Sequence, residues 1–429
     1  MGLGLLGRGV GDVRFLARAG AELIVTDIKT EEQLVSSLAE LNEFSNITYH
    51  LGGHMLEDFQ NRDMILKAAG VPSDSPYVAE AKKNHIPVRM SADLFVELSG
   101  VPTIGVTGTR GKSTTSHLLA HILKTAGREV FLGGNIRGVS TLAHLAEVTP
   151  DTTAVLELDS WQLQGFGEIK KSPNIAIFTT FMPDHMNYYK NDMAAYFADK
   201  ANIFLYQEED DQLILGEQMA SCIEEYGYKN KVRAHVTVTG ASLVPKSWKL
   251  KIPGEHNKMD IGIALAAARA FGIDDGDIQR AVESFEGVPG RLQFLREVRG
   301  IKIYNDTTAT VPDATVAALR ALGDEGKKNV LLIMGGADKN LDMTELLAEI
   351  PHYAKEVFLL AGTGTERIRT ELPGAQIFES MQAAVIAALN KGEAGDVLLM
   401  SPAFASFGMF RNEFDRGDQF SAIVASLAE

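Results

Sequence analysis

Short apolar runs alternate with amphipathic stretches along the whole chain, and this alternation restricts the fold more than any other feature of the sequence. Strands that are separated by helices form parallel sheets covered by those helices. The pattern begins with AELIVTD, restarts with PTIGVTG and restarts again with IKIYND. At about 150 residues per domain, the sequence predicts three α/β domains in series, over residues 1–93, 94–287 and 288–429.

The segment Val106–Ser113 lies between an expected strand and an expected helix, which is where a phosphate-binding loop has to lie. Its glycines let backbone N–H groups converge on phosphate oxygens. Lys112 adds a positive charge, and the hydroxyl of Ser113 suits Mg²⁺. The segment therefore predicts a central domain that is P-loop ATPase-like. The alternative is a glycine-rich helix start that binds no ligand.

The opening GLGLLG matches the glycine pattern of dinucleotide-binding turns, and Asp27 follows Gly7 by twenty residues. Only Met1 precedes these glycines, although such a turn normally follows an apolar strand. The chain also has a second nucleotide motif, and nothing downstream is typical of hydride transfer. We therefore expect a Rossmann-like domain with a different nucleotide-like ligand. A nicotinamide cofactor and a tight turn without a ligand are the alternatives.

Polar residues follow several other expected strands. Glu157 ends the strand TTAVLEL, and His185 follows the strand IAIFTTF. Ligands gather beyond the carboxyl ends of parallel strands, so both side chains are candidates for a metal site near the phosphate loop. A lone histidine is more often structural, and Lys200 by itself would be interpreted as a solvated helix charge.

The third domain carries four further polar segments at expected strand ends or turns, and it predicts a second Rossmann-like unit. Each segment is either a binding loop or a turn. They are Gly290-Arg291, Asn305-Asp306, Gly335–Lys339 and Ser401–Ser406.

Composition excludes several classes of protein. With 41 basic and 56 acidic residues, the net charge of −15 argues against broad nucleic-acid binding. The single Cys222 rules out a disulfide framework and favours a reducing compartment. No apolar run reaches the roughly 18–20 residues of a membrane span. We therefore expect a cytoplasmic protein without membrane or nucleic-acid partners.

Taken together, eleven segments in this order resemble the Mur ligases, a family of ATP-dependent amino-acid ligases of peptidoglycan precursor synthesis. The matching segments are GLGLLG, VTGTRGKST, GGNIRG, LELDSWQL, DHMNYY, YFADKANIF, GEHN, PGRLQF, YNDTTAT, GGADKN and SPAFASF. The resemblance implies that ATP and two Mg²⁺ ions drive the addition of D-glutamate to UDP-N-acetylmuramoyl-L-alanine through an acyl phosphate. It also implies a monomer whose first, second and third domains bind the UDP substrate, ATP with magnesium, and the amino acid.

The resemblance assigns roles residue by residue. The catalytic residues would be Lys112, Glu157, His185 and Lys200. ATP would be bound by Gly108, Thr109, Arg110, Gly111, Lys112, Ser113, Thr114, Asn257, Arg291 and Asp306. Magnesium would be held by Ser113, Glu157, His185 and Lys200, the last as a carbamylated lysine. The UDP substrate would lie against Leu5, Leu6, Asp27, Gly70, Asn135, Ser160 and Gln162. The incoming amino acid would face Thr310, Lys339, Ser406 and Phe407.

Two residues depart from the family pattern near the expected amino-acid site. Thr308 stands where familiar members carry a lysine, and Glu413 where they often carry a phenylalanine. These differences leave open a Mur ligase with another acceptor amino acid, and Arg411 and Arg416 are the nearest candidates for a replacement cation. An NAD(P)-dependent oxidoreductase and a non-catalytic nucleotide-binding regulator are the alternatives from other classes.

Overall fold

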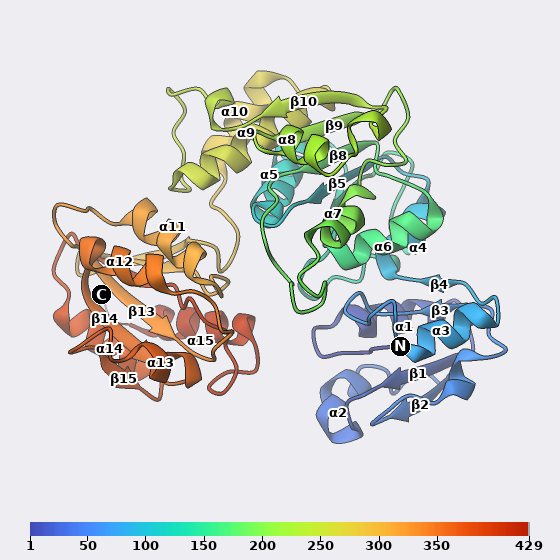
Figure 1. Cartoon of the computed structure of the whole chain (residues 1–429), viewed down its shortest axis with the longest axis horizontal. Helices are drawn as coiled ribbons and strands as arrows, with labels where there is room; N and C mark the ends of the chain where they lie inside the picture. The colour runs from blue at the N-terminus through green and yellow to red at the C-terminus, as the bar shows by residue number, and fades with distance from the viewer. Residues whose placement is uncertain (428–429) are drawn as a thin grey trace. The chain divides into compact units, whose positions relative to one another are not determined.

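The computed structural model describes residues 1–427, which form two compact units (Figure 1). The first unit comprises Met1–Pro245 and Met259–Ala281, and the second comprises Lys246–Lys258 and the chain from Val282 onward. Both are mixed α/β structures built on parallel strands, as the sequence predicts. Within the described chain, no helix has the length and apolar character needed to cross a membrane. The expected domain limits at 93/94 and 287/288 stay predictions.

The first part of the chain contains two small parallel sheets, one of β1 with β2 and one of β3 with β4. Met1 and Gly2 connect them. The amino group of Met1 donates to the carbonyl of Leu66 at 2.9 Å, and the amide of Gly2 donates to the carbonyl of Thr26 at 2.8 Å. These two residues thus lie where a leading strand would pair. The elements are β1 (Leu23–Asp27), β2 (Ile47–Leu51), β3 (Ile65–Leu66), β4 (Val88–Arg89), α1 (Arg8–Arg18), α2 (Glu31–Ala39), α3 (Pro76–Lys83) and α4 (Ser91–Ser99).

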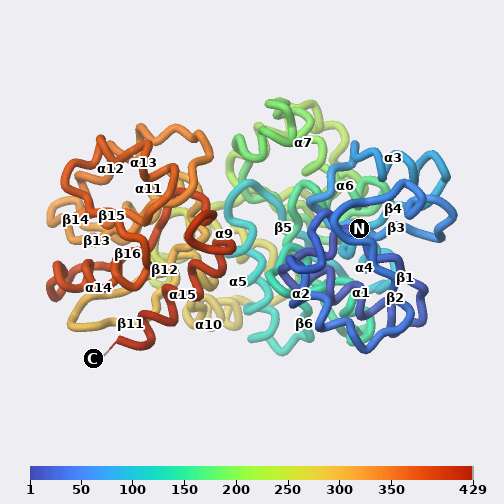
Figure 2. Tube along the Cα trace, turned by 90° about the horizontal axis from the view of Figure 1, so that it is seen from below, coloured from blue at the N-terminus to red at the C-terminus, as the bar shows by residue number. Residues whose placement is uncertain are grey.

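A half-buried carboxylate, Asp12 on α1, joins this first part to the segment that follows the strand β6 (Val130–Gly134). Its Oδ1 accepts hydrogen bonds from Ser91 Oγ at 2.7 Å and from Ser140 Oγ at 2.6 Å. Burial raises the pKa of Asp12 to about 6. The helices α1 and α4, which are labelled in Figure 2, both contact the 3₁₀ helix Leu142–Ala146.

The central part is a fully parallel six-stranded sheet in the order β10-β9-β8-β5-β7-β6. β5 lies between β7 and β8, with Val106 opposite Glu157 and Thr107 opposite Phe178. The ends of these three strands therefore meet at one edge of the sheet. The strands are β5 (Thr103–Thr107), β6 (Val130–Gly134), β7 (Thr153–Glu157), β8 (Ile175–Phe178), β9 (Gln212–Gly216) and β10 (His235–Thr239), and the helices are α5 (Lys112–Thr125), α6 (Ser160–Ile169), α7 (Met193–Ala201), α8 (Met219–Glu225), α9 (Glu255–Ala270) and α10 (Asp275–Ser284).

The C-terminal sheet has the order β11-β12-β16-β13-β14-β15, and all its pairs are parallel except β11 with β12. Residues of β12, β13, β14 and β16 make up much of its core. Its strands are β11 (Gln293–Val298), β12 (Ile301–Asn305), β13 (Val330–Gly335), β14 (Ala354–Leu360), β15 (Gln376–Phe378) and β16 (Val397–Met400), and its helices are α11 (Pro312–Leu322), α12 (Thr344–Tyr353), α13 (Thr363–Ile368), α14 (Met381–Lys391) and α15 (Glu413–Ser426).

Candidate functional site

The phosphate loop connects the end of β5 to the start of α5. Gly108 and Gly111 have φ angles of 148° and 86°, in the region that favours glycine. A Cβ on Gly111 would lie 2.3 Å from Asp260 Oδ1, so the loop has no room for a side chain there. The segment after β8 holds the loop in place, because Thr180 accepts from the amide of Thr109 at 2.8 Å and from the amide of Arg110 at 2.9 Å.

Two lysines converge on one carbonyl of this loop. Lys112 Nζ and Lys200 Nζ donate to the carbonyl of Gly108 at 2.9 Å and 3.0 Å. Lys200 is fully buried on α7, and its Nζ lies 5.0 Å from the centre of the Tyr196 ring. Burial and then the nearby charge of Lys112 lower the pKa of Lys200 well below its usual value. Burial therefore disfavours the charged form of this amine.

Glu157 is the last residue of β7 and is buried at the same edge of the sheet. The loop after β6 contacts it through Asn135, whose amide donates to the carbonyl of Glu157 at 2.7 Å. The side-chain Nδ2 of Asn135 also donates to Glu157 Oε1 at 3.3 Å. A residue expected at the UDP substrate thus contacts a residue expected at magnesium.

His185 lies in the loop after β8 with a φ of 55°, which is unusual for a side-chain-bearing residue. Its ring centre lies 4.7 Å from that of Trp161. The preceding Asp184 accepts from the amide of His185 at 2.9 Å and pairs with Arg110 of the phosphate loop at 2.9 Å. Burial lowers the pKa of His185, the charge of Asp184 opposes this shift, and the nearby charge of Lys112 adds to it. Asp184 was not predicted as a site residue, although Asp184 directly precedes His185 in the sequence.

These side chains suit a hard divalent cation bound to phosphate. Ser113 and Glu157 offer oxygen ligands, which Mg²⁺ prefers, and α5 begins with N–H groups that have no intrahelical acceptor. Within residues 1–427, no cluster of three or more His, Cys, Asp or Glu side chains has the arrangement of a metal site. Of the four expected magnesium ligands, only Glu157 and His185 are of these residue types, and the others are Ser113 and a modified Lys200. The binding of magnesium by these four residues therefore stays a prediction.

The helix α6 carries two of the expected UDP-substrate residues, and both are buried. Ser160 is its first residue. Gln162 caps the helix with Asp159, because the amide of Gln162 donates to Asp159 Oδ1 at 2.8 Å and the amide of Asp159 donates to Gln162 Oε1 at 3.2 Å. The conformation of Gln162 is therefore fixed by the helix start.

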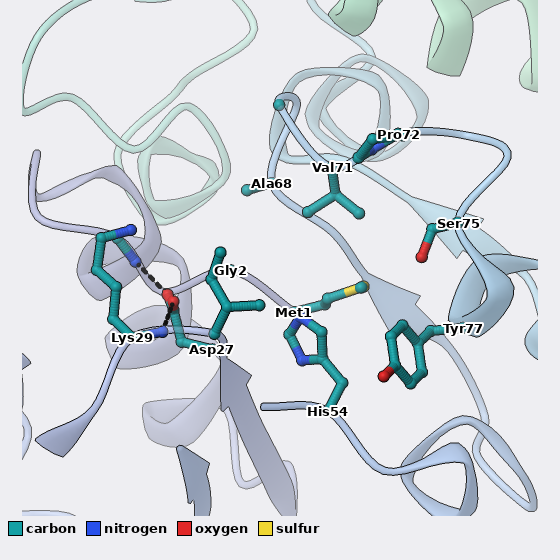
Figure 3. A pocket seen from close by; sticks show the side chains of 13 residues that line it. Met1, Gly2, Asp27, Lys29, His54, Ala68, Val71, Pro72, Ser75 and Tyr77 are labelled. Atoms are coloured by element: carbon teal, nitrogen blue, oxygen red, sulfur yellow. Dashed lines mark hydrogen bonds between the residues drawn. The ribbon is translucent and has the colours of Figure 1, made fainter. Parts of the chain in front are cut away.

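A cavity of about 400 Å³ lies between the two small sheets (Figure 3). Asp27 and Gly70 line it. Asp27 accepts from the amides of Gly4 and Lys29 at 2.9 Å each, so it fixes the glycine turn. Leu5 and Leu6 do not line the cavity, although Leu5 is 51% exposed.

Two aromatic rings on this cavity were not predicted. His54 and Tyr77 both line it, with ring centres 5.0 Å apart in an edge-on arrangement (Figure 3). These two rings form an aromatic wall of the cavity, whereas Asp27 contributes a carboxylate to its lining. Both come from segments in which a single His or Tyr has no distinguishing pattern, so the sequence offered no signal for them.

The second unit contains the remaining residues expected at ATP. Asn257 is buried near the start of α9, and its Nδ2 donates to the carbonyl of Pro253 at 2.6 Å. Asp306 follows β12 and accepts from the amide of Leu292 at 3.0 Å and from Ser401 Oγ at 2.8 Å. Burial raises the pKa of Asp306 to about 7. Asp306 therefore braces the segment that carries Arg291, and the binding of ATP by Asn257, Arg291 and Asp306 stays a prediction.

The expected amino-acid residues of the second unit are partly brought together. Lys339 Nζ donates to Thr310 Oγ1 at 3.0 Å. Ser406 is buried, whereas the neighbouring Phe407 is 63% exposed. The hydroxyl of Thr308 donates to the carbonyl of Gly290 at 2.9 Å.

The two arginines considered as replacement cations are engaged by the protein. Arg416 is completely buried and donates to the carbonyls of Thr307 and Phe404 at 2.8 Å and 3.2 Å. Burial lowers the pKa of Arg416 to about 10. Arg411 pairs with Asp415 at 2.9 Å on α15. Neither arginine is therefore positioned as a simple substitute for a lysine at Thr308.

Comparison with known proteins matches all three parts of the chain. Residues 1–90 match the family described as "Mur ligase MurD-like, N-terminal domain", residues 106–268 the "Mur ligase middle domain", and residues 290–404 the "Mur ligase, glutamate ligase domain". Relatives named UDP-N-acetylmuramoylalanine–D-glutamate ligase include that of Roseiflexus sp. (strain RS-1), which is 37% identical over 100% of this chain and 98% of the relative. That of Treponema pallidum is 30% identical over 100% of this chain and 97% of the relative.

Solved structures show the same fold at lower identity. The UDP-N-acetylmuramate–alanine ligase MurC of Thermotoga maritima has a TM-score of 0.63 at 18% identity, covering 99% of this chain and 98% of that protein. The MurF ligase of the same organism, solved in complex with ADP, has a TM-score of 0.59 at 16% identity, covering 87% of this chain and 97% of that protein.

Proposed function

This chain belongs to the Mur ligase family, and on that premise we propose that it joins D-glutamate to UDP-N-acetylmuramoyl-L-alanine at the expense of ATP. The observation that carries the proposal is the edge of the central sheet, where the phosphate loop, Glu157, Lys200 and the loop of His185 follow neighbouring strands or pack against them. The same unit contains a separate cavity suited to a nucleotide. Full-length relatives of that name support the choice of substrates.

ATP and Mg²⁺ together supply the chemistry that turns an unreactive carboxylate into an acyl phosphate, which an amine can attack. The residues of this chain bind and orient. The N–H groups at the start of α5, with Lys112, hold negative charge at the phosphate loop. Ser113 and Glu157 would hold the metal with His185, while Arg110 and Asp184 tie the loop to the His185 segment.

Lys200 is proposed to act as a carbamate. In its neutral form, the amine nitrogen would attack the carbon of CO₂ and form an N–C bond as one C=O π bond gives its electron pair to oxygen. Loss of one proton from the nitrogen would then leave an anionic carbamate that offers oxygen ligands. Complete burial and the neighbouring cation Lys112 favour the neutral amine that this step needs. The carbamate would also place a negative charge beside the cation Lys112, which shares the carbonyl of Gly108 with Lys200.

The second unit is proposed to hold D-glutamate. Lys339 and Thr310, which are in contact, would bind one carboxylate, and Ser406 and Phe407 would line the same site. Because D-glutamate carries two carboxylates, the missing lysine at Thr308 should weaken its binding. We propose that the protein acts in the cytoplasm, where ATP and the UDP-linked substrate are available. We also propose that it acts as a monomer.

The experiment that tests this proposal is ATP-dependent phosphate release with UDP-N-acetylmuramoyl-L-alanine across a panel of D- and L-amino acids. We expect phosphate release that requires all three substrates and prefers D-glutamate. Release with another amino acid would assign a different acceptor. Titration with UDP and NADH checks the first cavity, and preferential binding of NADH would support the oxidoreductase alternative instead.

A further inference from the structure

Arg8 lies where the first and central parts of the first unit meet, and the proposed roles do not include it. It is the first residue of α1 and follows Gly7, whose φ is 82°. A Cβ on Gly7 would lie 3.5 Å from the Cα of Gly138. The glycine turn and the loop after β6 therefore approach one another backbone to backbone, with Arg8 beside them.

The side chain of Arg8 contacts the residue that bridges to Glu157. Arg8 Nη1 donates to Asn135 Oδ1 at 2.7 Å, and Asn135 Nδ2 donates to Glu157 Oε1 at 3.3 Å. A guanidinium can only donate and an ionised carboxylate can only accept. One orientation of the Asn135 carboxamide satisfies both neighbours, and a flipped amide would satisfy neither.

Arg8 is not the sole residue that attaches α1 to the central part. The hydrogen bonds of Ser91 and Ser140 to Asp12 already fix this helix. Arg8 also forms no ion pair within residues 1–427, and its hydrogen bond to Asn135 is the one that its side chain makes there. The contact therefore has a consequence for Asn135 that is separate from the packing of the helix.

We infer that Arg8 is a positioning residue for the UDP-linked substrate, because it holds the Asn135 carboxamide in one orientation between the glycine turn and Glu157. The inference rests on the proposed function, in which Asn135 binds the middle of that substrate. Without Arg8, the amide oxygen loses its charged donor, and the carboxamide is held by the longer hydrogen bond to Glu157. A hydrogen bond to a charged group is stronger than one between neutral groups, so its loss should be measurable in binding.

The test is a double-mutant cycle in the full-length protein, read out as the calorimetric dissociation constant of UDP-N-acetylmuramoyl-L-alanine without ATP. Arg8→Met should weaken binding about tenfold, and Arg8→Lys should restore part of the loss. In an Asn135→Ala background, Arg8→Met should change binding by less than about twofold, because the group that Arg8 orients is gone. The matched control is Arg14→Met on the same helix, which removes an exposed pair with Glu40 and should leave binding within about twofold.

Binding of ADP serves as the second readout, and every variant should retain it. Wild-type affinity in Arg8→Met, or effects of Arg8→Met and Asn135→Ala that multiply fully, would overturn the inference. If the melting temperature of Arg8→Met is well below that of Arg14→Met, Arg8→Lys replaces Arg8→Met in the cycle. Unchanged UDP-substrate binding by Arg8→Lys, together with effects of Arg8→Lys and Asn135→Ala that are independent of one another, would then overturn the inference. Failure of the wild-type protein to bind the UDP substrate would instead refute the proposed function, and the inference with it.

Discussion

Replacing Thr308 with lysine should strengthen the binding of D-glutamate. The hydroxyl and amide of Thr308 both donate to the carbonyl of Gly290, at 2.9 Å and 3.1 Å, and the neighbouring Thr307 donates to the backbone carbonyl of Glu413 at 2.6 Å. Thr308 thus directly follows a residue that contacts the backbone of Glu413, so positions 308 and 413 lie in one neighbourhood.

The size of the effect follows from the exposure of Thr308. Two unit charges 4 Å apart are worth about 4 kcal/mol at an effective dielectric of 20, whereas exposed pairs measure about 0–1 kcal/mol. Thr308 is half-buried, and Glu413 opposes an incoming carboxylate. We therefore expect a gain of about 1 kcal/mol, which is about a fivefold fall in the KM for D-glutamate.

The assay is steady-state phosphate release at saturating ATP and UDP substrate, with Thr308→Met as the control. Methionine removes the same hydrogen bond to Gly290 and fills similar space without a charge. The difference between the two variants should shrink at high salt, because the interaction is partly exposed. A KM for Thr308→Lys that equals or exceeds that of Thr308→Met would show that charge at this position does not govern acceptor binding.

Three further predictions concern single residues. Lys112→Ala should abolish ATP turnover while calorimetry finds UDP-substrate binding within about twofold of wild type, since the loop and the cavity are separate; parallel loss of both would refute that separation. Lys200→Ala should abolish ligation, with partial recovery in millimolar short carboxylates, and full activity without them would exclude a carbamate. Because the pKa of Asp306 is raised to about 7, its contribution to stability is present below about pH 4 and is lost as pH rises to about 7. Asp306→Asn should therefore gain stability relative to wild type between pH 5 and pH 8 in urea unfolding, and a constant difference would contradict the shift.

The sequence predicted several of the strands that are buried on both faces, but it did not predict β9, four of whose five residues are buried. β8 is an uninterrupted apolar run, β7 is apolar between Thr153 and Glu157, and every residue in both strands is buried. β10 was not identified, because four of its five residues are exposed and no apolar face distinguishes it from a loop. β11 was also missed, since it is partly exposed and pairs antiparallel to its neighbour in an otherwise parallel sheet.

The candidate site follows the same division. Glu157 and the loop of His185 could be placed together because neighbouring parallel strands end at one edge. The contact between Asn135 and Glu157 depends on the pairing of β6 with β7. The order of strands across a sheet cannot be predicted from the sequence of either strand. His54 and Tyr77 form a cavity wall only after two separate segments have folded against the first sheets.

The carboxylate of Asp12 has a consequence for recombination between relatives. It takes one donor from Ser91, on its own side of the expected boundary at 93/94, and one from Ser140, on the other side. A chimera that exchanges residues 1–93 would carry Asp12 and Ser91 into a host that need not supply Ser140. The half-buried carboxylate would then lose one of the two hydroxyl donors that it has here, which is costly where water is partly excluded. Residues 1–93 can therefore be exchanged between relatives only together with the loop after β6. The segment that has to be exchanged is thus larger than the domain that the sequence pattern predicts.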